Sequence, residues 1–96
     1  MSLEKLVASL GHPLGRRILR YYEDGGRRAT PEQLAEALDM PVVDVEDHLV
    51  LLVEGGALLQ AQPEDAAGYF YESALRGETE WVRRVLEASR EKDGDR

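Results

Sequence analysis

The chain has 96 residues, of which 43% are apolar and 32% charged, and this length supports one soluble domain with one core. No apolar run approaches the roughly 20 residues of a membrane-spanning helix, and the first residues lack the basic and apolar segments of a signal peptide. Cysteine is absent, which excludes disulfides, thiolate metal sites and cysteine nucleophiles. We therefore expect a cytoplasmic protein. Its net charge of −7 argues against nucleic acids and membrane surfaces as default partners.

Two short helices are predicted at the start of the chain. The first runs from about Ser2, a suitable N-cap, to Leu10 and ends at Gly11. The second begins at Pro13, which suits the first turn of a helix, and ends near Asp24.

A helix-turn-helix unit is predicted next. Thr30, Pro31 and Gln33 form a capping-box start for a helix that ends at Leu38. A link of about three residues leads to a fourth helix, from about Pro41 to the glycines after Glu54.

The pattern then changes to short strands, 58–62 and 69–73, joined by a hairpin loop. A last helix begins at about Glu78, with Glu80 placed to pair with Arg84. We expect one domain over residues 1–90 and a frayed, charged tail over 91–96. The predicted fold class is mainly α with a small β-hairpin, in the order α-α-α-α-β-β-α.

This order resembles a winged helix of the ArsR transcription-regulator family. The resemblance covers about Leu3 to Leu75. Its residues are His12-Pro13 with Arg17-Ile18-Leu19-Arg20, Leu34 to Leu38, Val45 with His48-Leu49, Leu52, Glu54 and Gly56-Ala57-Leu58, and the aromatic run Tyr69-Phe70-Tyr71.

The resemblance implies a homodimer built from the first and last helices. A domain this small can also bury the apolar faces of its first and last helices by pairing with a second copy of itself. The expected interface residues are Leu3, Leu6, Val7, Leu10, Trp81, Val82, Val85 and Leu86. The alternative is that Trp81, Val85 and Leu86 cover the core of their own subunit.

The fourth helix departs from the family. DNA-binding members present residues there that hydrogen-bond bases or phosphates, whereas this chain has valines and carboxylates. All twelve cations lie outside the 47 residues from Ala29 to Leu75, which hold ten acids. DNA affinity depends substantially on Lys and Arg contacts to phosphates, so docking on DNA through this helix is disfavoured.

A protein-docking face is predicted instead, with valines among carboxylates. Its residues are Val43, Asp44, Glu46, Asp47, Val50, Glu54, Glu64 and Asp65. The alternatives are an inert solvated surface and a transcriptional repressor that binds DNA with atypical contacts. DNA binding would then use phosphate contacts from Arg16, Arg17, Arg20, Arg27 and Arg28, unless these arginines pair with Glu4, Glu23 or Asp24.

Other chemistry is not indicated. His12 is expected to cap a helix or lie at the surface, and His48 to pack beside the core. The two histidines do not form a recognisable metal-ligand spacing, and no nucleophile or acid–base pair marks a catalytic pocket. We expect a non-enzymatic protein without a metal or cofactor.

Overall fold

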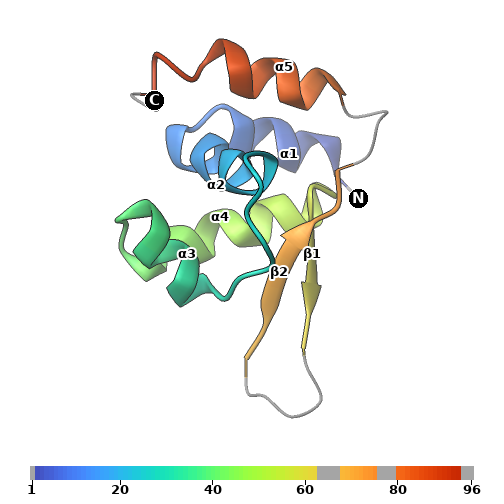
Figure 1. Cartoon of the computed structure of the whole chain (residues 1–96). Coiled ribbons are helices and arrows are strands. Elements are labelled where there is room, and N and C mark those ends of the chain that lie inside the picture. Colours follow the sequence, from blue (N-terminus) through green and yellow to red (C-terminus); the bar gives the residue numbers. More distant parts are fainter. Residues whose placement is uncertain (1, 63–67, 76–79, 94–96) are drawn as a thin grey trace.

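The computed structural model describes residues 2–62, 68–75 and 80–93. The predicted order of elements is confirmed (Figure 1). Helix α5 lies above α1 and α2, helices α3 and α4 lie below, and the hairpin projects beside them. The elements are α1 (Leu3–Leu10), α2 (Pro13–Glu23), α3 (Pro31–Leu38), α4 (Val42–Glu54), β1 (Leu58–Ala61), β2 (Phe70–Ser73) and α5 (Glu80–Ala88).

The helix starts follow the local signals in the sequence. The Ser2 side chain accepts the Lys5 N–H at the start of α1. Thr30 and Gln33 form a complete capping box at the start of α3, in which each side chain accepts the other residue's backbone N–H. These bonds satisfy N–H groups that have no partner inside a helix, so both starts are encoded locally.

The hairpin is the wing of the fold. Strands β1 and β2 are antiparallel, with Leu58 opposite Ser73 and Ala61 opposite Phe70. Ala29, just before α3, forms a further antiparallel bridge to Tyr71, and the Tyr22 hydroxyl donates to the Tyr71 carbonyl at 2.7 Å. These contacts attach the wing to α2 and to the start of the helix-turn-helix. Most of the predicted hairpin loop lies outside the described residues.

One hydrophobic core joins all of the helices and the wing. Its fully buried side chains include Ile18, Leu19, Leu34, Val45 and Leu52, which lie on the apolar faces of α2, α3 and α4. Among the described residues, no helix is both long enough and apolar enough to span a lipid bilayer.

Candidate functional site

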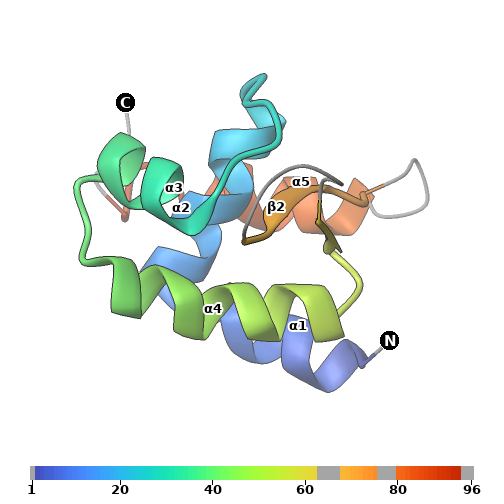
Figure 2. The same cartoon turned by 90° about the horizontal axis from the view of Figure 1, so that it is seen from below.

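Helix α4 runs along one face of the molecule beside α3 and the wing, as the view from below shows (Figure 2). Its buried side faces the core through Val45, Leu49 and Leu52. On the opposite side Val43 and Val50 are 62% and 56% exposed. These exposed fractions are high for valine, because valine side chains in folded globular proteins are usually buried.

Carboxylates surround the two valines. Asp44, Glu46 and Asp47 are all exposed on α4. Asp44 lies in the first turn, where a negative charge interacts favourably with the helix dipole. We call the five residues Val43, Asp44, Glu46, Asp47 and Val50 the α4 face.

Glu54 does not belong with the α4 face. Its carboxylate accepts a hydrogen bond from the Lys5 ammonium on α1, and its backbone carbonyl accepts the Ser2 N–H. Glu54 therefore joins the end of α4 to the start of α1. Glu64 and Asp65, also predicted for the docking face, lie outside the described residues.

Two of the five predicted phosphate-contacting arginines are buried inside the subunit. Arg16 and Arg20 are only 7% and 2% exposed. Arg16 donates to both carboxylate oxygens of Asp93, at 2.7 and 2.6 Å, and to the Leu10 carbonyl at 2.8 Å. Arg20 pairs with Asp93 at 2.8 Å and also donates to the Leu86 carbonyl. The prediction was wrong for these two side chains, which cannot reach a phosphate group without leaving the core.

Asp93 was missed as a structural residue. The sequence predicted fraying from Glu91 onward, yet the Asp93 side chain is 1% exposed between the two arginines. Hydrogen bonds from Arg16 and Arg20 hold the pKa of the Asp93 carboxyl well below its usual range, although burial opposes this shift. The local sequence gives no sign of this role, because Asp93 and its partner Arg16 are 77 positions apart in the chain.

The remaining arginines of the predicted set differ in their surroundings. Arg17 is half-buried and donates to the Leu38 carbonyl at 2.9 Å, at the end of α3. Arg27 and Arg28 are exposed in the loop between α2 and α3. The Arg28 guanidinium lies 5.4 Å from the centre of the Phe70 ring, close enough for a cation–π contact.

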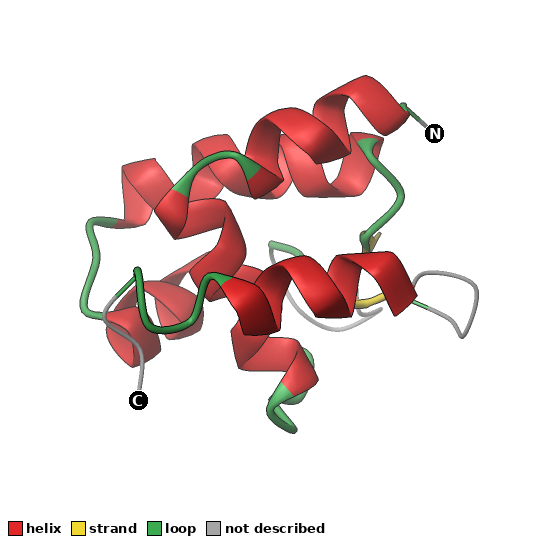
Figure 3. Ribbon diagram, turned by 90° about the horizontal axis from the view of Figure 1, so that it is seen from above, coloured by secondary structure: helices red, strands yellow, loops and turns green. Residues whose placement is uncertain are grey.

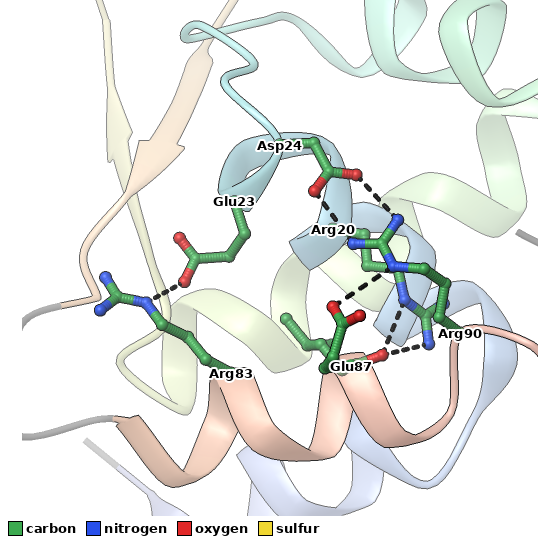
Figure 4. Close-up of a pocket in the computed structure, with 7 residues that line it drawn as sticks. Arg20, Glu23, Asp24, Arg83, Glu87 and Arg90 are labelled. Atoms are coloured by element: carbon green, nitrogen blue, oxygen red, sulfur yellow. Dashed lines mark hydrogen bonds and ion pairs between the residues drawn. The ribbon is translucent and has the colours of Figure 1, made fainter. Parts of the chain in front are cut away.

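A pocket of about 330 Å³ lies between the end of α2 and helix α5. Figure 4 shows charged side chains that pair between the two segments, Arg83 with Glu23 and Arg90 with Asp24, while Arg90 also pairs with Glu87 of α5. The pairing of Glu23 and Asp24 with arginines was expected, but their partners lie on α5 and just after it, not on α2. The ion pairs that line this pocket therefore connect the α5 segment to the end of α2, and their positive and negative charges balance.

The predicted dimer residues divide into two groups. Leu6, Leu10, Val82 and Leu86 are buried in the core of the single chain, so little of their surface is left for a dimer interface. Leu3, Val7, Trp81 and Val85 remain exposed. Figure 3, seen from above, shows α5 on one side of the molecule together with α1, which lies beside the N-terminus.

The side chains of the two histidines are in contact in the structure. His12 caps α2, because its Nδ1 atom accepts the Leu14 N–H at 3.1 Å. His48 on α4 lies with its ring centre 4.6 Å from that of His12, and its Nδ1 atom is 3.2 Å from the Ser9 hydroxyl. Within the described part of the chain, no three His, Asp or Glu side chains are grouped so that they could hold a metal ion.

The fold is similar to that of a solved ArsR family transcriptional regulator. The two structures superpose with a TM-score of 0.62 over 94% of this chain and 87% of the other, at 19% sequence identity. This likeness confirms an ArsR-type winged-helix fold, as the sequence predicted. No family model matches the sequence, and no curated protein resembles it.

Proposed function

We propose that this chain is a non-enzymatic, homodimeric winged-helix protein of the transcription-regulator type, whose α4 face binds a basic protein surface. The solved regulator of the same fold supports the regulator type. The observation that carries the docking proposal is the exposure of Val43 and Val50 among the three carboxylates of the α4 face. Protein interfaces combine an apolar centre with a polar rim in this way.

Charge favours a protein partner over DNA. Elements α3, α4, β1 and β2 contain no lysine or arginine. A duplex that approached the α4 face would meet carboxylates opposite its phosphates and would release no counterions there. Valine, moreover, offers no hydrogen bond to a base edge. A basic protein surface gains from the same carboxylates, which steer it during association.

Reversing the charge of the α4 face is expected to weaken partner binding. The combined change Asp47→Arg and Val50→Lys removes one apolar anchor and makes the face repel a basic surface. Affinity capture followed by quantitative mass spectrometry should show a basic partner reduced about tenfold or more, equivalent to about 1.4 kcal/mol. Asp47→Arg alone is compared with Glu91→Arg, because both change one exposed carboxylate into a cation.

Retention of the same partners by the double variant would refute protein docking at the α4 face. A fluorescence-anisotropy titration with duplex DNA tests the alternative, a DNA-binding repressor, which the exposed Arg27 and Arg28 favour. We expect no binding even at about 50 mM salt, where phosphate contacts are strongest. Salt-sensitive binding that disappears on changing Arg27 and Arg28 to alanine would support the repressor.

Exposed apolar side chains on α1 and α5 support the proposed homodimer. Leu3 is 62% and Val7 54% exposed on α1, and Trp81 is 40% exposed on α5. A second copy would cover these side chains by two-fold pairing of the same surface. The apolar surface that remains for the interface is smaller than the sequence predicted, because four of the eight residues belong to the core.

The combined change Val7→Asp and Val85→Asp is expected to convert a dimer into a monomer in sedimentation-velocity experiments at roughly 10 μM protein. The reason is that carboxylates placed in an apolar interface lose their hydration without gaining partners. Val43→Asp is the control, because Val43 is also exposed but belongs to α4. A monomeric wild-type protein, or a variant that stays dimeric, would contradict this interface.

A further inference from the structure

The contact between His12 and His48 joins two parts of the fold. His12 lies at the corner between α1 and α2, and His48 lies in the middle of α4. The ring centres are 4.6 Å apart with the planes tilted by 45°. A pocket of about 330 Å³ opens beside the rings, and it is lined by His12, Leu14, Met40, Asp44, Asp47 and His48.

The cap formed by His12 requires a neutral ring. Its Nδ1 atom accepts the Leu14 N–H at 3.1 Å, and a nitrogen that carries a proton cannot accept a hydrogen bond. A second proton on the ring would therefore break the cap. It would also place a positive charge at the N-terminus of α2, where the helix dipole disfavours cations.

His48 is also held in a setting that favours the neutral ring. Its Nδ1 atom lies 3.2 Å from the hydroxyl of Ser9, a fully buried residue of α1. Burial and the neighbouring His12 lower the pKa of His48, while Asp47 and Asp44 oppose the shift. These two carboxylates and His12 are the charged or titratable groups that face the ring, since Ser9 of α1 and Leu14 of α2 carry no charge.

The linkage between protonation and stability follows from the direction of this shift. The pKa of His48 is lower in the folded chain than the unfolded value of about 6.5. The neutral ring therefore adds stability that is fully present above about pH 6.5 and is lost as the pH falls toward the folded pKa. A proton on both rings is disfavoured further, because the two charges would be close together.

We propose that His12 and His48 form a proton-sensitive latch, which holds α4 against the α1–α2 corner when both rings are neutral and releases it on acidification. The unprotonated pair keeps the α2 cap, the Ser9 contact and the ring contact together. Protonation removes the cap and places two positive charges close together, so the middle of α4 separates from the first turn of α2. This latch does not depend on what the α4 face binds.

The test is hydrogen exchange of backbone amides measured by NMR at about pH 7.5 and about pH 5, together with the titration of each histidine ring. The Leu14 amide and the amides of α4 near His48 are expected to lose protection about tenfold on acidification, once the intrinsic pH dependence of exchange is removed. Carboxylates contribute little in this range, because their usual pKa values are near 4.

Two variants separate the latch from a purely structural contact. His12→Asn keeps a side chain that caps helices well but carries no titratable group, and His48→Gln removes the other titrating ring. The combined variant, which has neither titrating ring, should retain its protection at about pH 5 to within about twofold of its value at about pH 7.5. Each single variant should lose less protection than the wild type. Equal loss of protection in the wild type and in both variants, or a His48 ring that titrates at or above about pH 6.5, would overturn the proposal.

Discussion

Replacing Asp93 with asparagine is expected to lower the free energy of unfolding by about 3 kcal/mol, the usual scale for removing one partner of a buried ion pair. The Asp93 carboxylate is the shared partner of Arg16 and Arg20. An asparagine of the same shape keeps one acceptor but removes the negative charge that the two guanidiniums share. Urea unfolding followed by circular dichroism at neutral pH measures the change.

Glu91→Gln is the control for this change, because it removes a carboxylate from an exposed position two residues away. It should alter the free energy of unfolding by less than about 0.5 kcal/mol. The pKa of Asp93 is lowered in the folded chain, so its stabilisation is present above the unfolded pKa of about 3.9 and is lost as the pH falls below it. The difference between wild type and Asp93→Asn should shrink accordingly in acid. Equal stability of the two variants at neutral pH would show that the buried pairing is unimportant.

Replacing Gly15 with alanine is expected to destabilise the fold by about 3 kcal/mol, the upper end of the range for overpacking. A Cβ atom at this position would lie 2.1 Å from the Ser9 carbonyl oxygen and 2.3 Å from the Ser9 hydroxyl. The carbonyl belongs to the backbone of α1, so the two helices must move apart. This cost exceeds the gain of about 1 kcal/mol that alanine brings to a helix.

Gly11→Ala is the matched control in the same corner. Its Cβ atom would meet its nearest neighbours at 3.5 and 3.6 Å, which is ordinary van der Waals contact. The φ angle of −77° is also accessible to alanine. We expect a change of less than about 0.5 kcal/mol in the free energy of unfolding. If both variants unfold alike, the close approach of α1 and α2 at Gly15 is not a constraint on the fold.

The exposure of the α4 face can be predicted from the sequence of α4 alone, whereas the burial of Arg16 cannot. The helical spacing places Val45 and Leu49 on one side of α4, and Val43 and Val50 therefore lie on the other. The spacing of the apolar residues is sufficient to predict these two sides, because it concerns residues of a single helix. Arg16 also lies on an amphipathic helix, yet its burial depends on a carboxylate that arrives from the far end of the chain.

Local patterns were sufficient to predict the order of the elements and the caps at Ser2 and Thr30, and the resemblance to the ArsR family predicted the winged-helix fold. The order and the caps depend on hydrogen bonds and apolar spacing between residues a few positions apart, which is why they can be predicted without a structure. Three features could be recognised only in the folded chain: Asp93 pairs with Arg16 and Arg20, His12 contacts His48, and Leu6 and Leu86 are core residues. Each of these contacts joins separate helices, and the packing of the whole core selects which charged and apolar side chains meet.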